Sequence, residues 1–174
     1  VRVDCATPVE MGISIRIPEW CESPTVAVSS ADDGGIDAAQ GYWRSHRRWR
    51  SGDVIEVILP MEPARIYPDP RVRQDAYSVA FARGPLVYCF EEADNGADLS
   101  AVAVRRDAAP TVVRQDGLLG KTVALAVPGV RRRIGDRLYS AARSEEEEVS
   151  LTAVPYALWG HRGEGEMKVW MPER

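Results

Sequence analysis

Three carboxylates stand close together near the middle of the chain, and their type and spacing make them the first candidates for chemistry. Glu91, Glu92 and Asp94 follow directly on an apolar run at residues 86–90. Glycoside hydrolysis in its usual form uses two carboxylates about 5–9.5 Å apart. Side chains alternate between the faces of a strand, so Glu91 and Glu92 would point to opposite sides if the strand continues. We therefore expect a polar strand end leading into a hairpin turn at residues 94–96, not a catalytic pair.

The other nucleophiles, bases and metal ligands are scattered. His46 and His161 lie in arginine-rich and glycine-rich surroundings, and neither has a Ser or Cys beside it in a nucleophile motif. Cys5, Cys21 and Cys89 are far apart and form no CxxC pair, which argues against a disulfide framework and against a four-ligand zinc site. We predict no catalytic residue and no metal site in this chain, and we expect reduced, buried cysteines in a cytoplasmic protein.

Aromatic residues offer a different chemistry, namely stacking against sugar rings. Trp43, Trp49 and Trp159 are the candidate carbohydrate-binding residues. Tyr42 precedes Trp43 on one predicted strand, so these two side chains must face opposite sides. Aromatic residues at strand positions more often pack in a core or between domains, and that interpretation stays open beside the stacking one.

The composition of the chain limits the kinds of partner that we expect. The chain has 174 residues, of which 26 are acidic and 22 are Lys or Arg, giving a net charge of −4. An acidic balance argues against a nucleic-acid partner. No apolar run approaches the roughly 20 residues that cross a bilayer, so we expect no membrane partner.

Residues 1–4 contain neither an initiator Met nor an apolar signal core, and we expect them to lie inside a longer chain. The acidic run at residues 145–148 is typical of a solvated loop, with cation binding as the less favoured alternative.

Strand patterns dominate the elements that must position these residues. Met11, Ile13, Ile15 and Ile17 alternate with Gly or polar residues, which predicts a half-buried strand. The apolar run at residues 54–59 predicts a strand covered on both faces. Further strands are expected at residues 25–29, 41–43, 77–82, 86–90, 101–105, 111–114, 122–127, 149–154 and 166–171, with a turn at residues 32–35.

Four prolines within residues 60–70 favour an extended connection and mark a domain boundary. We therefore predict an all-β fold of two consecutive antiparallel β-sandwich domains with little helix, the first at residues 1–65 and the second at residues 66–174. The second domain contains a charged surface loop at about residues 131–148. The pair Gly84 and Pro85 predicts a bulge or bend between two buried strands.

Several motifs occur in a characteristic order along the chain. They are residues 15–20 (IRIPEW), 41–42 (GY), 47–49 (RRW), 52–53 (GD), 59–61 (LPM), 83–88 (RGPLVY), 154–156 (VPY), 159–163 (WGHRG) and 166–170 (EMKVW). In this order they resemble the region that follows the catalytic barrel in the β-L-arabinofuranosidase-like enzymes of glycoside hydrolase family 127, the DUF1680 type. The match extends over nearly the whole chain except about residues 97–148. His161 and the pair Ser29-Ser30 depart from the asparagine and the asparagine–glycine turn usual in the family.

The resemblance implies two β-sandwiches packed behind an (α/α) barrel. In that family the zinc-bound cysteine nucleophile and the acid/base glutamate belong to the barrel. No catalytic residue therefore carries over to this chain, and zinc is expected only in the absent catalytic domain. The implied partner is the barrel of the parent chain, and two copies could also form a homodimer.

We favour a non-catalytic accessory portion of a bacterial glycoside hydrolase that supports the missing barrel. The alternative is a carbohydrate-binding module that uses surface tryptophans. An independent enzyme would require carboxylates that converge without a sequence signal. A first module of about 65 residues would be marginally stable alone, which fits a domain that relies on neighbours. The accessory hypothesis also predicts an exposed apolar face around residues 15–20 and 83–88, where the barrel would dock.

Overall fold

The computed structural model describes residues 1–29, 35–37, 41–116 and 120–174, so the turn expected at residues 32–35 falls largely outside the described residues. The chain divides into two compact units, Val1–Met61 and Glu62–Arg174. Strands predominate in both units, and every helix in the described part of the chain is a single short turn. The predicted all-β class is confirmed. None of the helices among these residues has the length and apolarity that crossing a bilayer requires.

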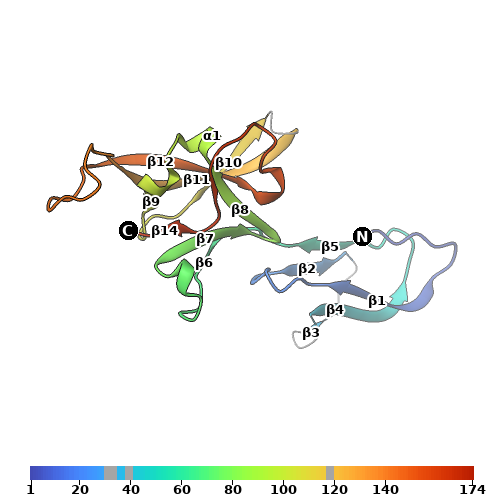
Figure 1. Ribbon diagram of the computed structural model, residues 1–174. Coiled ribbons are helices and arrows are strands. Elements are labelled where there is room, and N and C mark those ends of the chain that lie inside the picture. Colours follow the sequence, from blue (N-terminus) through green and yellow to red (C-terminus); the bar gives the residue numbers. More distant parts are fainter. Residues whose placement is uncertain (30–34, 38–40, 117–119) are drawn as a thin grey trace. The chain divides into compact units, whose positions relative to one another are not determined.

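The first unit folds into two small sheets (Figure 1). Its strands are β1 (Val9–Arg16), β2 (Thr25–Val28), β3 (Gly35–Asp37), β4 (Tyr42–Trp49) and β5 (Ile55–Ile58). One sheet has the order β1-β4-β3, and the other pairs β2 with β5. Strands β1 and β4 pair antiparallel over their full length, with Val9 opposite Trp49 and Arg16 opposite Tyr42.

The core of the first unit draws on both sheets. Trp43 and Trp49 of β4 are 2% and 0% exposed and pack with Ile55 of β5. The Trp49 indole N–H donates to the Met11 carbonyl oxygen at 3.1 Å, which satisfies the one polar atom that this side chain buries. Along β1 Met11, Ile13 and Ile15 are half-buried and the residues between them are exposed, so the predicted alternation is confirmed.

The expectation that residues 54–59 are covered on both faces is wrong. Ile55 is fully buried and Val57 packs against the core, but Val54 and Ile58 are 39% and 53% exposed. The reason is that β5 belongs to a two-stranded sheet with only one face on the core. The outward positions of this strand are therefore Glu56 and Ile58, one charged and one apolar.

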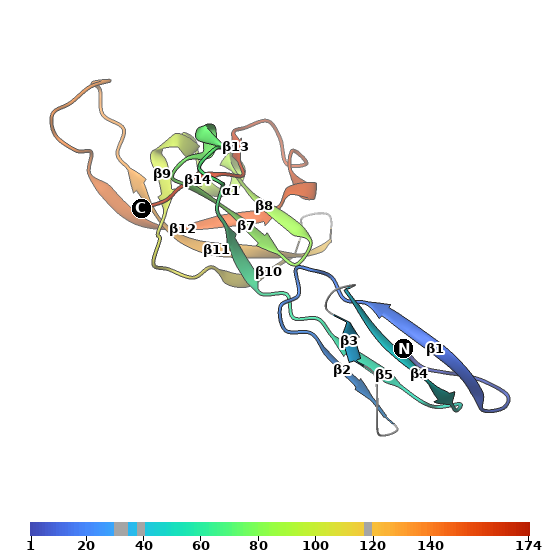
Figure 2. The same cartoon turned by 90° about the horizontal axis from the view of Figure 1, so that it is seen from below.

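The second unit is built on one curled antiparallel sheet (Figures 1 and 2). Its strands are β6 (Pro63–Ile66), β7 (Ser78–Arg83), β8 (Leu86–Glu91), β9 (Val102–Val104), β10 (Thr111–Asp116), β11 (Lys121–Arg132), β12 (Glu146–Pro155), β13 (Met167–Lys168) and β14 (Met171–Pro172). Its helical turns are η1 (Arg73–Asp75), α1 (Glu92–Asn95), η2 (Leu99–Ala101) and η3 (Tyr156–Leu158). The sheet has the order β10-β11-β12-β8-β7-β14, with β6 beside β7, β9 beside β11 and β13 beside β8.

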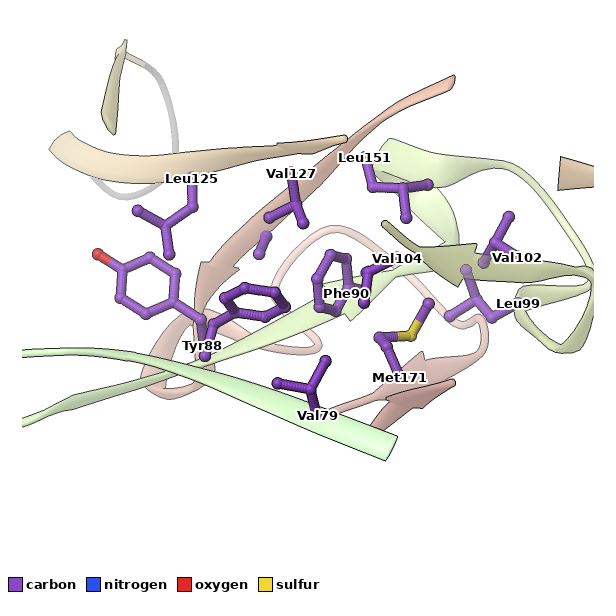
Figure 3. Packing of buried hydrophobic residues seen from close by; sticks show 12 residues of the cluster. Val79, Tyr88, Phe90, Leu99, Val102, Val104, Leu125, Val127, Leu151 and Met171 are labelled. Atoms are coloured by element: carbon purple, nitrogen blue, oxygen red, sulfur yellow. The ribbon is translucent and has the colours of Figure 1, made fainter. Parts of the chain in front are cut away.

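The core of the second unit lies inside the curl of this sheet. Figure 3 shows Phe90 of β8 between Val79 of β7 and Val127 of β11, all of them fully buried. Phe90 also meets Phe81 edge to face, with ring centroids 5.9 Å apart. The Tyr88 hydroxyl donates to the Val123 carbonyl oxygen at 2.9 Å, so this side chain links β8 to β11.

Two predicted turns have a different form in the structure. Gly84 and Pro85 make a two-residue hairpin between the paired residues Arg83 and Leu86, with Gly84 at a φ of 56°. A glycine tolerates that angle where other residues do not, so the pair closes a hairpin instead of a bulge. The hairpin expected at residues 94–96 is wrong, since the chain enters the helical turn α1 there and β9 pairs with β11.

The charged segment around residues 131–148 is partly strand. Strands β11 and β12 run further than predicted, and the intervening loop extends away from the body of this unit in Figure 2. Ion pairs join the strand ends across this hairpin, for example Arg133 with Glu145 at 3.2 Å. The strand expected at residues 166–171 is divided into β13 and β14, which pair with different neighbours.

Candidate functional site

The stretch after β12 turns back over the outer face of β8, and residues 156–169 are called the return segment here. Its strand β13 pairs with the end of β8, with Met167 opposite Glu91. Beneath it lies a small apolar cluster of Cys89, Ala124 and Val154, against which Met167 and Val169 pack. The return segment therefore covers the face of the sheet that points away from the main core.

Arg162 anchors the return segment through two of the three candidate carboxylates. Its guanidinium group donates to Asp94 Oδ1 at 2.5 Å and contacts the Glu91 carboxylate as well. The Glu91 and Asp94 side chains are only 7% and 11% exposed, and that of Arg162 is 23% exposed. Charge-assisted hydrogen bonds of the planar guanidinium to two carboxylates are strong and geometrically specific.

The remaining hydrogen bonds of these acids go to backbone groups. The Gly160 N–H donates to Glu91 Oε1 at 2.9 Å. The Glu166 N–H donates to Glu92 Oε2 at 2.9 Å, and Glu166 in turn accepts from the Leu99 N–H at 2.6 Å. The carboxylates thus hold the return segment against α1 and the chain that follows it.

Electrostatics at this cluster follow from burial and pairing. The hydrogen bonds of Asp94 and then of Glu91 raise the pKa of Arg162 further above its ordinary value, so this residue stays charged. Burial, followed by the charge of Glu91, raises the pKa of the Cys89 thiol to about 12. Cys89 is therefore a protonated core residue and not a nucleophile at neutral pH.

This arrangement does not provide the chemistry that paired carboxylates perform in glycoside hydrolases. A general acid and a nucleophile must both reach a substrate. Here Glu91 and Asp94 are largely buried and directed at Arg162, while Glu92 binds a backbone amide. What the cluster can do chemically is fix a loop.

The three candidate tryptophans differ in how much of their surface is exposed. Trp43 and Trp49 lie in the core of the first unit and expose 2% and 0% of their surface, so neither ring can stack against a sugar. That part of the platform prediction is corrected, because β4 turns both indoles to the same inner face. Trp159 is 45% exposed on the return segment, where it stacks with Tyr156. For Trp159 the carbohydrate role stays a prediction.

The histidines and cysteines do not converge on a metal site. His46 is exposed on the outer face of β4, and His161 is exposed on the return segment. The three cysteines are free thiols, and no group of His, Cys, Asp and Glu suited to a metal ion occurs in the part of the chain that the structure describes. The zinc centre that the family resemblance implies belongs to the barrel, and its presence there stays a prediction.

The sequence analysis did not predict the structural roles of Arg162 and Asn95. The Asn95 side-chain amide donates to the Glu91 and Thr152 carbonyl oxygens, both at 2.9 Å, and its oxygen accepts from the Thr152 N–H at 2.7 Å. Asn95 thereby joins α1 to β12. The signal that could have found Arg162 is an arginine in a glycine-rich stretch directly after an aromatic residue, within the motif at residues 159–163.

Two family models together match nearly the whole chain. The GH127 middle domain of the beta-L-arabinofuranosidases matches residues 1–61, and the glycoside hydrolase family 127 C-terminal domain matches residues 63–172. The non-reducing end beta-L-arabinofuranosidase of Bifidobacterium longum subsp. longum is 33% identical, over 95% of this chain and 26% of that protein.

Solved structures agree with this match. A GH127 beta-L-arabinofuranosidase from Geobacillus stearothermophilus T6 is 34% identical with a TM-score of 0.90, and the similarity covers 99% of this chain and 28% of that one. A second GH127 beta-arabinofuranosidase is 28% identical with a TM-score of 0.85, over 97% of this chain and 28% of its own. The chain thus spans about a quarter of the length of the relatives it matches.

The fold and the family matches together define the class of protein: the chain consists of two all-β units that match domains of glycoside hydrolases. The chain belongs to glycoside hydrolase family 127, and it corresponds to the middle and C-terminal domains of that family. The family resemblance inferred from the motifs is confirmed.

Proposed function

We propose that this chain is the non-catalytic accessory portion of a β-L-arabinofuranosidase-like hydrolase and that it supports a catalytic barrel. The observation that carries the proposal is the engagement of Glu91 and Asp94 with Arg162, which leaves the best candidate carboxylates in a structural role. The span of the chain, about a quarter of its relatives, leaves room for chemistry elsewhere in the parent protein.

Exposed apolar side chains support a docking role. Leu86 and Val87, at the start of β8, are 38% and 49% exposed, within the expected patch at residues 83–88. Around residues 15–20 the exposed positions are the polar Arg16 and Glu19, so that part of the expected apolar face is absent. Contiguous exposed apolar surface on a soluble protein commonly marks a site where another surface packs.

Substitution of Glu91 in the parent protein, expressed from the complete gene, tests the proposal. An accessory role predicts that Glu91→Gln lowers the melting temperature of the protein but leaves kcat on an aryl β-L-arabinofuranoside unchanged below that temperature. A catalytic role predicts a loss of kcat of about 100-fold or more with the fold intact, which would refute the proposal.

Further properties are proposed with the accessory role. The barrel of the parent chain is the partner, with zinc held there, and the units could also support a homodimer in a cytoplasmic protein. Light scattering of the parent protein and metal analysis of the parent and of this chain test these expectations. Zinc bound in stoichiometric amount by this chain alone would contradict them.

A further inference from the structure

Two aromatic side chains lie together on the surface of the return segment. Tyr156 and Trp159 are 46% and 45% exposed, and their ring centroids are 6.0 Å apart with an angle of 26° between the planes. At that separation nearly parallel rings are offset, so neither ring covers the other. Neither residue takes part in the hydrophobic cores of its unit. The packing of the hydrophobic cores therefore does not explain why two large aromatic side chains lie together on this surface.

The pair is held in place without a ligand. The Trp159 N–H donates to the Tyr156 carbonyl oxygen at 3.1 Å and closes the turn that brings the rings together. The next residue, Gly160, donates its N–H to the buried Glu91, and Arg162 clamps the segment two residues further on. A site that is rigid before binding loses less conformational entropy when a ligand arrives.

Acidic groups border Trp159, one member of the aromatic pair. A depression of only about 10 Å³ beside Trp159 is lined by Glu92, Glu164 and Glu166. It is too small to enclose a ring, so a ligand would lie on the surface. Carboxylates accept hydrogen bonds from hydroxyl groups and repel anions.

We propose that Tyr156 and Trp159 form a surface site for a neutral oligosaccharide. The apolar C–H face of a sugar ring would stack on the indole, and the exposed Glu164 at the rim would accept hydrogen bonds from sugar hydroxyls. The site uses residues of the return segment alone. It is therefore independent of the accessory role and needs no catalysis.

The test is calorimetric titration of the chain with short arabino-oligosaccharides, with xylo-oligosaccharides as a second neutral probe. Trp159→Ala should weaken binding of whichever probe binds by at least about ten-fold. Trp159→Phe should retain part of the affinity. Tyr139→Ala is the matched control, because Tyr139 is 90% exposed on the β11–β12 loop and should leave binding unchanged. Circular dichroism checks that each variant folds.

Three results would overturn the proposal. The first is no binding of either probe by the native chain. The second is equal binding by the native chain and Trp159→Ala. The third is binding by this chain but not by the longest product of the gene, since the aromatic pair would then be covered by another domain.

Discussion

Removing the guanidinium group of Arg162 should destabilise the second unit strongly. Arg162→Met replaces the aliphatic stem of the arginine but leaves Glu91 and Asp94, which are 7% and 11% exposed, without their cation. Breaking a buried ion pair by removing one partner typically costs about 3–5 kcal/mol. Because 23% of the Arg162 side chain is exposed, we expect a value near the lower end, about 3 kcal/mol. For a domain of this size that corresponds to a fall in melting temperature of about 10 °C or more.

Differential scanning calorimetry and urea unfolding measure the effect. The matched control is Arg105→Met, since the Arg105 and Glu148 side chains are 34% and 71% exposed and their pair should contribute almost nothing. A second control neutralises the stranded acids: Glu91→Gln with Asp94→Asn, added to Arg162→Met, should recover much of the lost stability. Equal small shifts for Arg162→Met and Arg105→Met would refute the reasoning that burial makes the first pair matter.

Further outcomes concern the two cores. Trp49→Ala should cost about 3–5 kcal/mol in urea unfolding, because the indole is fully buried, and a loss below about 1 kcal/mol would contradict the described core. Gly129→Ala should cost about 1–3 kcal/mol, because a Cβ there would lie 2.6 Å from the Ala103 carbonyl oxygen and 2.8 Å from Leu151 Cδ1, whereas Gly135→Ala meets nothing within 4 Å and should change little. The Cys89 thiol should resist alkylation in the folded chain at pH 8, since burial raises its pKa to about 12. Because that pKa is higher in the folded than in the unfolded state, the Cys89 contribution to stability is present below pH 9 and is lost as pH rises toward 12, a loss that Cys89→Ala should remove.

Local periodicity predicted much of the first unit. The alternation in β1 has a period of two, and Met11, Ile13 and Ile15 are half-buried as expected. The same rule could have placed the tryptophans, because Trp43 and Trp49 share one parity along β4 while Arg44 and Arg48 share the other. Sequence alone did not say which parity faces inward. The burial pattern of β4 answers that question.

The contacts of the return segment lie beyond local rules. Arg162 and Glu91 are separated by 71 positions, and no spacing pattern connects residues so far apart. The failed hairpin at residues 94–96 has the same origin. The Asn95 side chain bonds to Thr152, 57 positions away, and that tertiary contact stabilises a helical turn where the local sequence favours a β-turn.

The central claim is that this chain supports a hydrolase without performing the hydrolysis. Its most direct test compares two proteins on one aryl β-L-arabinofuranoside: the chain of 174 residues and the longest product of its gene, each shown to be folded. The account predicts turnover by the longer protein and none by the chain. Turnover by the chain alone, above the level of a mock purification, would contradict it.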